Sequence, residues 1–340
     1  MRVGIDTTKL ADRDGLGVYV RELVMALAPL DIDLVLDCRD TDPKRIRACF
    51  EPGMSIAIER DPVDIDLYHI TAWQLPRFQG PLITTCYDLT FLSHPHTHTL
   101  DNRIVCLTGV LEASLAGARF VSISQTTRDA LRDRLGIESD VIYPGVAKRF
   151  QPHDASHLGV APGRDLEPGF VLSVGTRQPR KNLDRLYAAH RALPAPLRER
   201  HPLLLVGSDG WGEIALPDDP HVMPLGEVSD HDLPALFSHA ACFAYPSLAE
   251  GFGMPVIEAM ACGAPVVTSD RGALREAAGD AARLVEPTDV DSIREGLAAV
   301  LEDSETATRL RRRGFKRAAR FHWSRCATEM LALYQRSLTA

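Results

Sequence analysis

Two series of apolar, strand-like runs alternate with helical patterns along this chain, and a stretch rich in Pro, Gly, His and Asp, residues 147–169, separates them. Because alternating strands and helices build parallel sheets, each series predicts one doubly wound α/β domain. The runs are, in order, RVGID, DLVLDC, SIAIE, DLYHI, PLITTCYD, RFVSIS and VIYPG, then FVLSVG, HPLLLVG, HVMPLG, CFAYPS, APVVTSD and AARLVEP. In the second series we expect helices to open near Asn182, Ser229, Met254, Arg271 and Asp289.

The chain length agrees with this division, since 340 residues are enough for roughly two domains of 100–200 residues. We expect an N-terminal domain over residues 1–150 and a C-terminal domain over residues 165–320. Ligands of such sheets bind outside the carboxyl ends of the strands. The expected site is therefore a cleft between the two domains.

Composition excludes several classes of function. A net charge of −8 argues against sequence-independent nucleic-acid binding, which needs a basic surface. Seven scattered cysteines without a C-x-x-C pair indicate neither a disulfide framework nor a zinc site and fit a reducing cytoplasm. No run approaches the ~18 apolar residues that span a bilayer, and the N-terminus lacks the apolar core of a signal peptide. We expect a cytoplasmic protein whose membrane contact, if any, is peripheral. The basic segment 309–338 favours a solvated helix followed by a packing helix, with an anionic membrane or nucleic acid as the alternative.

Glycine-bearing turns follow several of the strand-like runs. Glycine allows main-chain N–H groups to approach a ligand closely, and a helix N-terminus adds partial positive charge, so such turns suit phosphates. The alternative is that these glycines only turn the chain. The turns are DGLGVY with Gly15 and Gly17, SVGTRQPRKN with Gly175, LVGSDGWGE with Gly207, and EGFGMP with Gly251 and Gly253.

The segment TRQPRKN places three cations, Arg177, Arg180 and Lys181, after a strand and before a helix that Asn182 can cap. Three cations on a turn with free N–H donors predict an anion site. The alternative is a solvated basic loop.

Two glutamates, Glu250 and Glu258, stand eight residues apart in SLAEGFGMPVIEAMACGAPVV, around a turn that leads into a helix expected from about Met254 to Cys262. Glu258 could accept hydrogen bonds from both hydroxyls of a ribose, and Glu250 from hydroxyls of a sugar. The alternative for Glu258 is an exposed helix residue, although the surrounding helix is apolar and charge is rarely buried without a partner.

In the first half, Asp88 follows a buried-looking strand and is expected either to face the cleft or to cap its loop. His94, His96 and His98 alternate as metal ligands can, but Pro95 interrupts them and no carboxylate or cysteine follows at ligand spacing. We therefore predict a polar loop and no metal site.

A dinucleotide site is a further alternative, since Gly15-x-Gly17 is followed by Asp37 at the spacing of a ribose-binding acid. Val20 replaces the third glycine, however, and eight residues separate RVGID from Gly15, so this interpretation is disfavoured.

Several longer motifs are shared with a known family: VGTRQPRKNL, the run from LGEVSDHDL to AARLVEP, FHWSRCA, GLGVYVRELVMAL, YDLTFLSHP and VIYPGV. The chain resembles the GT-B retaining glycosyltransferases of family 4, also called group 1, and most of all the mannosyltransferase-B-like group that builds bacterial surface polysaccharides. The resemblance covers essentially the whole chain and is more specific in its second half. It implies two Rossmann-like domains facing across a cleft, with a nucleotide-sugar donor held mainly by the C-terminal domain and an acceptor by the N-terminal one. It also implies that catalysis needs no metal or cofactor, and that the last helix, 323–340, packs back on the first domain.

The resemblance assigns roles to individual residues. Glu258 matches the ribose-binding second glutamate of the family's E-x7-E motif, and Glu250 matches the first, which holds sugar hydroxyls. Lys181 matches the diphosphate-binding lysine, whose partner charge here comes from Arg177 or Arg180. The other matches act through main-chain groups: Gly17 in the loop over the diphosphate, Gly251, Phe252 and Gly253 beside the sugar or diphosphate, and Val228 beside the base.

One position departs from the family pattern, because Tyr87 precedes Asp88 where a histidine is common. A tyrosine donates a hydrogen bond but cannot share histidine's proton chemistry near neutral pH, so sugar identity does not carry over. The resemblance implies transfer of a hexose or deoxyhexose, mannose-like favoured, from a GDP- or UDP-linked donor to a saccharide or lipid-linked acceptor. The alternatives are a GT-B phosphorylase or sugar-phosphate synthase and, because of Tyr87, a catalytically silent nucleotide-sugar-binding subunit. The oligomeric state is left open.

Overall fold

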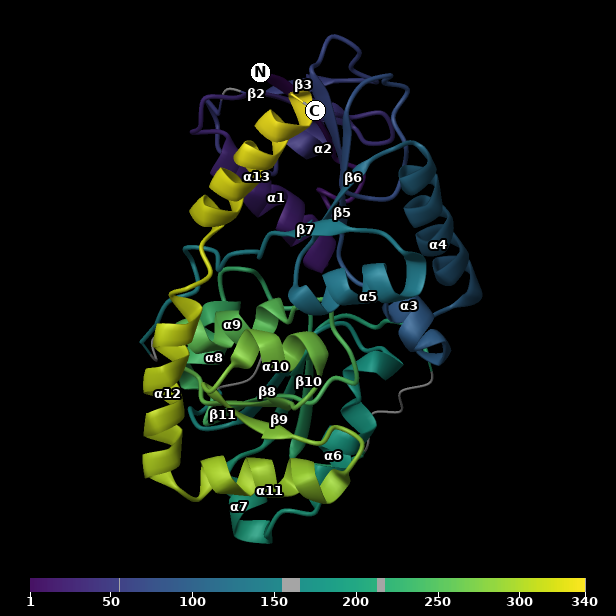
Figure 1. Cartoon of the computed structure of the whole chain (residues 1–340). Helices are drawn as coiled ribbons and strands as arrows, with labels where there is room; N and C mark the ends of the chain where they lie inside the picture. The colour runs from purple at the N-terminus through teal and green to yellow at the C-terminus, as the bar shows by residue number, and fades with distance from the viewer. Residues whose placement is uncertain (55, 155–165, 213–217, 340) are drawn as a thin grey trace. The chain divides into compact units, whose positions relative to one another are not determined.

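The computed structural model describes residues 1–54, 56–154, 166–212 and 218–339, and the chain divides into two compact units (Figure 1). Unit 1 comprises Met1–Gly145 and the chain from His322 onward, and unit 2 comprises Val146–Phe321. Residue 165, the expected start of the C-terminal domain, and much of the expected linker lie outside the described residues.

Unit 1 is built on a parallel sheet of order β3-β2-β1-β4-β5-β6-β7. Most strands are buried on both faces, which is why they read as continuous apolar runs. The last expected run, VIYPG, is misplaced, because β7 ends at Val141 before the proline that cannot donate to a ladder. The strands are β1 (Arg2–Asp6), β2 (Asp33–Asp37), β3 (Ala57–Glu59), β4 (Leu67–Ile70), β5 (Leu82–Cys86), β6 (Arg119–Ser122) and β7 (Ser139–Val141).

Four helices of unit 1, α1, α2, α4 and α5, begin where a local side chain accepts one of their first N–H groups. Asp14 accepts from the main-chain N–H of Gly17, and Ser124 from that of Thr127. The C-terminal helix α13 packs on α1 within this unit, where the rings of Trp323 and Tyr19 meet at 5.4 Å. The helices are α1 (Gly15–Leu27), α2 (Pro43–Arg47), α3 (Thr90–Ser93), the 3-10 helix η1 (Pro95–Thr97), α4 (Leu100–Leu115), α5 (Gln125–Leu135) and α13 (Trp323–Leu338).

Unit 2 contains a second parallel sheet, of order β10-β9-β8-β11-β12-β13. Alternate residues of its strands enter two apolar cores, so that Val171 and Leu203 lie in one and Leu172 and Leu204 in the other. Helices therefore cover both faces, which confirms the expected doubly wound class. The strands are β8 (Val171–Val174), β9 (Leu203–Val206), β10 (Val222–Gly226), β11 (Cys242–Tyr245), β12 (Val266–Ser269) and β13 (Ala282–Val285).

The helices of unit 2 depart from expectation at two starts. The helix expected near Ser229 begins at Leu233, because Ser229 and Asp232 bond to each other in a preceding turn. Asn182 does not cap the helix after it with its side chain. The helices are η3 (Pro179–Lys181, 3-10), α6 (Leu183–Arg191), α7 (Ala195–Arg200), α8 (Leu233–His239), α9 (Met254–Ala261), α10 (Gly272–Ala278), α11 (Val290–Leu301) and α12 (Ser304–Ala318).

Candidate functional site

Charged side chains gather in unit 2 beyond the carboxyl ends of β8 and β11. Lys181 Nζ donates to Glu250 Oε1 at 2.9 Å, and Arg180 pairs with the other oxygen of the same carboxylate. Arg180 also donates to the main-chain oxygen of Ala249 at 2.8 Å. We call Arg180, Lys181 and Glu250 the cationic cluster, because it holds two positive charges against one negative.

The turn that carries both cations is fixed by a left-handed residue. Asn182 has φ of 60°, and its side-chain amide donates to the main-chain oxygens of Pro246 at 2.9 Å and Pro287 at 2.6 Å. These bonds tie the turn after β8 to the segments that follow β11 and β13. The expected helix cap is thus replaced by a tertiary tether, which holds Arg180 and Lys181 at the strand ends.

The cationic cluster is shielded from solvent, with side-chain exposures of 11% for Arg180, 12% for Lys181 and 9% for Glu250. Burial alone would raise the pKa of Glu250, but Arg180 and Lys181 outweigh it and lower that pKa to about 2. The carboxylate therefore stays ionised at neutral pH. One positive charge remains in excess, which suits an incoming anion.

Tyr245, the last residue of β11, is a member of the site that the sequence analysis missed. Lys181 Nζ donates to its hydroxyl and lies 4.9 Å from its ring centroid. The ring stacks on Phe243, and burial raises the pKa of the phenol. In the sequence Tyr245 looks like one more buried strand residue. The signal that could have found it is a hydroxyl at the carboxyl end of an otherwise apolar strand.

A cavity of about 10 Å³, roughly the room that one water molecule needs, lies against Lys181 and Tyr245. Gly175 and Gly207 line it, with φ of 144° and 139°. A Cβ on Gly207 would come within 2.2 Å of the Gly175 oxygen, and one on Gly175 within 3.2 Å of Lys181 Cε. Glycine is thus needed for the close approach of the two strand ends and for the lysine stem.

The two candidate arginines are placed differently. Arg180 contacts Glu250, whereas Arg177 pairs with Asp209, to which its main chain is also bridged. Arg177 lines the same small cavity as Lys181 and is 18% exposed. Both cations therefore belong to this edge of the sheet, and Arg180 is the one that shares a carboxylate with Lys181.

Glu258 lies on α9 and is only 8% exposed, so the alternative of an exposed helix residue is wrong. Gly253 precedes this helix with φ of 103°, where a Cβ would approach Leu274 to 2.7 Å. Phe252 is buried and its ring packs edge-on against Phe321. The side chain of Phe252 therefore belongs to the core.

Val228 is partly buried and packs against the same core cluster as β8 and β9.

In unit 1, Gly15 opens α1 and Gly17 lies in its first turn. A Cβ on Gly17 would meet the main-chain oxygen of Asp12 at 2.0 Å. Tight packing of the loop before α1 is therefore a sufficient structural reason for this glycine, beside any role toward a phosphate.

Tyr87 and Asp88 follow β5 in unit 1. Tyr87 is 8% exposed, its ring meets that of Tyr19 edge-on at 5.2 Å, and its hydroxyl has no hydrogen-bond partner among the described residues. Asp88 Oδ1 accepts from the main chain of Thr90 at 2.8 Å and from its hydroxyl at 2.6 Å. Asp88 thus forms the loop cap that was its alternative interpretation.

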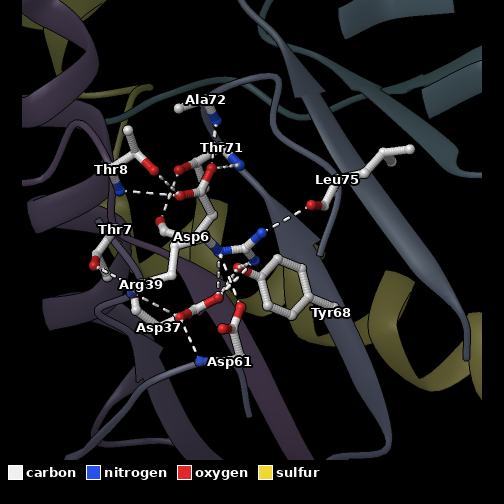
Figure 2. A network of polar contacts seen from close by, with 10 residues as sticks. All are labelled: Asp6, Thr7, Thr8, Asp37, Arg39, Asp61, Tyr68, Thr71, Ala72 and Leu75. Atoms are coloured by element: carbon white, nitrogen blue, oxygen red, sulfur yellow. Dashed lines mark hydrogen bonds and ion pairs between the residues drawn. The ribbon is translucent and has the colours of Figure 1, made fainter. Parts of the chain in front are cut away.

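The order of the unit 1 sheet reverses between β1 and β4, which is where doubly wound sheets usually open a crevice for a ligand. At this position Figure 2 shows a network of polar contacts within the chain, around Asp6 and Asp37. The Asp6 carboxylate accepts main-chain N–H groups of Thr8 at 2.9 Å, Ala72 at 2.8 Å and Thr71 at 3.3 Å. Burial raises the pKa of Asp6 despite these bonds. These three main-chain donors are therefore engaged by a carboxylate of the chain itself.

Figure 2 also shows the partners of Asp37 within the fold. The Asp37 carboxylate is buried and accepts from Arg39 Nε at 2.8 Å and from the Tyr68 hydroxyl at 2.7 Å. Arg39 in turn donates to the main-chain oxygen of Leu75 at 2.8 Å. Because the Asp37 carboxylate is buried and already engaged by Arg39 and Tyr68, the structure gives no support to the dinucleotide alternative.

The three alternating histidines lie around η1. His98 bonds to Thr90 and Asn102 at 2.9 Å each, and His94 to Ser93 at 2.9 Å. Within the described residues no group of three His, Cys, Asp or Glu side chains could hold a metal ion. In the same part of the chain, every helix is too short or too polar to cross a bilayer.

Comparison with known proteins places this geometry in a family. The family described as "Glycosyl transferases group 1" matches residues 160–317. The O-antigen chain mannosyltransferase B of Escherichia coli is 33% identical over 282 residues, which cover 79% of this chain and 74% of that protein. The phosphatidyl-myo-inositol mannosyltransferase of Mycolicibacterium smegmatis is 31% identical over 293 residues, covering 80% and 71%.

Solved structures show the same fold. Sucrose-phosphate synthase from Thermosynechococcus elongatus superposes with a TM-score of 0.75 at 21% identity, covering 99% of this chain and 98% of that one. Anabaena HepE, in complex with UDP and glucose, gives 0.76 at 16% identity, covering 99% and 100%. The family resemblance and the GT-B architecture expected from the sequence are confirmed. The chain therefore belongs to the group 1 glycosyltransferases of GT-B fold.

Proposed function

We propose that this glycosyltransferase moves a hexose or deoxyhexose, a mannose-like sugar being favoured, from a GDP- or UDP-linked donor to a saccharide or lipid-linked saccharide in bacterial surface polysaccharide synthesis. The observation that carries the proposal is the buried cationic cluster at the carboxyl edge of the unit 2 sheet. The choice of mannose and of surface glycan rests on the names of the two mannosyltransferase relatives, one of which acts on the O-antigen chain. The proposed donor is a substrate, and no cofactor is part of the proposal.

In this proposal the donor diphosphate lies against Lys181 and Arg180, whose charges exceed that of Glu250 by one. A carboxylate has about four acceptor positions, so Glu250 can keep both cations and still accept from sugar hydroxyls. Glu258 would bind the ribose, and Val228 would lie beside the base. The remaining donor contacts are proposed from the turns that carry Gly15, Gly17, Gly175, Gly251, Phe252 and Gly253, although the N–H groups of Gly17 and Gly175 already donate to Asp14 and Val206.

The chemistry follows from where charge develops. Departure of the leaving group builds negative charge on the diphosphate, and Lys181 with its neighbouring arginine would stabilise that charge more in the transition state than in the ground state. In the retaining reaction that we propose, the acceptor hydroxyl attacks from the leaving-group face and a phosphate oxygen takes its proton. No protein nucleophile is required, and the side-chain cations supply the charge for which other transferases use a metal ion.

Peripheral contact with the inner membrane face is part of the proposal, because a lipid-linked acceptor would be found there. Its support is the outward face of α12, where Arg309, Arg312, Arg313 and Lys316 are exposed while Leu310 packs inward. Arg312→Glu and Lys316→Glu should each reduce cosedimentation with anionic vesicles, whereas Arg134→Glu on α5 should not. Equal loss in all three variants would contradict a specific role of α12.

The function is tested by thermal-shift measurements with UDP, GDP, ADP and dTDP sugars, since a ligand of the native state raises its apparent stability. One donor should stabilise the wild type and the Lys316→Ala control and should stabilise Lys181→Ala much less. Product analysis with that donor then separates the alternatives. Transfer to a saccharide supports the proposal, phosphate-dependent products indicate a phosphorylase or sugar-phosphate synthase, and binding without transfer or donor hydrolysis indicates a silent subunit.

A further inference from the structure

The helix α4 of unit 1 carries two apolar faces, although it borders the rest of the unit on only one of them (Figure 1). Gly109, Val110 and Ala113 form the inward face and are buried. The opposite face presents Leu100, Ile104, Leu111 and Leu115, which are 65%, 54%, 44% and 88% exposed. At about 100° per residue these four side chains fall within roughly 60° of one another and form a continuous stripe. We call them the outer stripe.

An outward apolar stripe of this kind is unusual on a soluble protein, whose surface helices are normally polar on the face away from the core. The charges beside the outer stripe argue against a lipid surface as its partner. Asp101 and Glu112 flank it on one side, whereas helices that lie on membranes carry Lys and Arg on their polar face. Arg103 is on the other flank, where its Nε is buried without a hydrogen-bond partner among the described residues.

The spacing of the outer stripe reads the same from both ends. Its members are separated by four, seven and four residues, so the pattern is symmetric about the peptide bond between Leu107 and Thr108. An interface between two identical copies around a two-fold axis requires this kind of self-complementary pattern. We propose that α4 is an isologous dimerisation surface on which two copies of this chain pair in antiparallel orientation. Leu100 then lies beside Leu115 of the second copy, and Ile104 beside Leu111.

The area available limits the dimer to a weak one. The four side chains are already partly covered, so their complete burial in both copies would remove at most roughly 800 Å² of surface from water. Specific, stable interfaces begin near about 1,000 Å² in total. We therefore expect a weak dimer that forms only at high protein concentration.

The antiparallel arrangement also predicts how dimerisation depends on the salt concentration. The two-fold axis places the same flank of both helices on one side of the pair, so Asp101 of one copy approaches Glu112 of the other. Like charges at this rim repel one another, and the repulsion is screened by salt. Dimerisation should therefore strengthen as the salt concentration rises, and Glu112→Gln should strengthen it at low salt.

The test is sedimentation velocity on the full chain over a range of concentrations. The wild type should show a monomer–dimer equilibrium, and Ile104→Glu and Leu111→Glu should each raise its dissociation constant at least tenfold. Val63→Glu is the matched control, because Val63 is 72% exposed but lies outside α4. Circular dichroism checks that each variant is folded. A wild type that stays monomeric throughout would overturn the proposal, as would a Val63→Glu defect equal to the others.

Cysteine cross-linking tests the orientation. Thr108→Cys places a thiol next to the proposed axis and should form a disulfide-linked dimer under mild oxidation, above the wild-type background. Leu100→Cys should not link to its own copy, because the two positions would lie about 22 Å apart along the helices. The reverse result would indicate parallel pairing and contradict the proposal. Binding of monomer to vesicles through the same side chains would show that the occupant is lipid instead.

Discussion

Lys181 is held by two groups of different chemistry, the carboxylate of Glu250 and the phenol of Tyr245. The carboxylate balances part of its charge, whereas the phenol offers an acceptor and a ring face without adding charge at neutral pH. We therefore assign Tyr245 the role of positioning residue for Lys181.

Tyr245→Phe should keep the ring beneath Lys181 and remove only the hydroxyl. Loss of one hydrogen bond, worth about 0.5–1.5 kcal/mol, predicts a decrease in kcat of roughly three- to tenfold, with a smaller change in the donor KM. Steady-state kinetics measure kcat and the donor KM separately. Tyr187→Phe on α6 is the control and should leave both constants unchanged. If Tyr245→Phe weakened nucleoside binding by the same factor as it lowers kcat, the result would indicate a general structural defect.

Glu258→Ala should weaken donor binding more than it affects folding. A charge-assisted hydrogen bond to a ribose is worth about 1.5–3 kcal/mol, which corresponds to a loss of affinity of roughly tenfold or more. Calorimetric titration with the bare nucleoside diphosphate measures this loss of affinity. Replacing the nucleotide by its 2′-deoxy form should weaken binding to the wild type more than it weakens binding to the variant. Unchanged affinity in a folded variant contradicts the ribose role.

Tyr87 raises a different question, because its hydroxyl is buried and has no hydrogen-bond partner in the part of the chain that the structure describes. Tyr87→Phe should be neutral or stabilising in urea unfolding, since it removes an unsatisfied polar group and keeps the packing against Tyr19. If Tyr87 touches the sugar, the ratio of kcat/KM for two competing donors should change in Tyr87→Phe and Tyr87→His. A constant ratio would leave Tyr87 as a packed aromatic.

At the scale of elements, α13 is attached to the unit 1 sheet through a buried polar chain. His69 on β4 bonds to the Tyr334 hydroxyl at 2.7 Å and to the Thr85 hydroxyl at 2.8 Å. Burial lowers the pKa of His69 to about 3, so the ring is neutral in the folded protein at ordinary pH. Neutral histidine, tyrosine and threonine thus form the buried part of this docking, and Arg336 of α13 adds an ion pair to Asp140 of β7 at 3.5 Å.

This docking predicts a loss of stability in acid. The unfolded chain protonates His69 near pH 6.5, whereas the folded chain resists protonation until about pH 3, so stability is complete above 6.5 and falls between these values. At pH 5 the loss from this group is about 2 kcal/mol. In urea unfolding at pH 7.5 and 5, the stability gap between wild type and His69→Gln should narrow by that amount. His231→Gln, at an exposed position, should follow the wild type.

Elements buried on both faces were predictable from sequence, because β1, β8 and β11 are short, mostly apolar runs between turn residues. The cluster of Arg180, Lys181 and Glu250 was predictable as a set of charges beside strand ends. The long-range hydrogen bonds that hold this cluster in place were not predictable. Asn182 was expected to cap its own helix, but its amide reaches Pro287, 105 residues away, and only the folded sheet brings the two together.

The same limit explains the other departures. Asp37 has the local spacing of a ribose ligand, yet Tyr68, 31 residues later, donates to its carboxylate. Asp88 and Tyr87 stand side by side in sequence, but the carboxylate of Asp88 bonds to Thr90 in its own loop while Tyr87 is buried in the core. Local pattern identifies which residues can do chemistry, whereas partners distant in sequence decide which of them are already engaged.

At the scale of the whole molecule, unit 1 is assembled from two separate stretches of chain, whereas unit 2 is continuous. Ending the chain after Phe321 should therefore expose Tyr19 and His69 in unit 1 and leave the cores of unit 2 intact. Hydrogen exchange should show faster exchange in β1, β4 and α1, with unchanged protection in β8 and β11. Loss of protection in both units would show that they unfold together.

The placement of α13 also sets an order of events during synthesis. A ribosome delivers residues 1–145 first, but their apolar surface around Tyr19 and His69 stays uncovered until the chain beyond His322 has emerged. Every residue of unit 2 has by then been translated. The first unit to be made is consequently the last to be completed, which reverses the usual order in which N-terminal domains finish folding first. Nascent chains of this protein should therefore be bound by chaperones through unit 1 until α13 arrives.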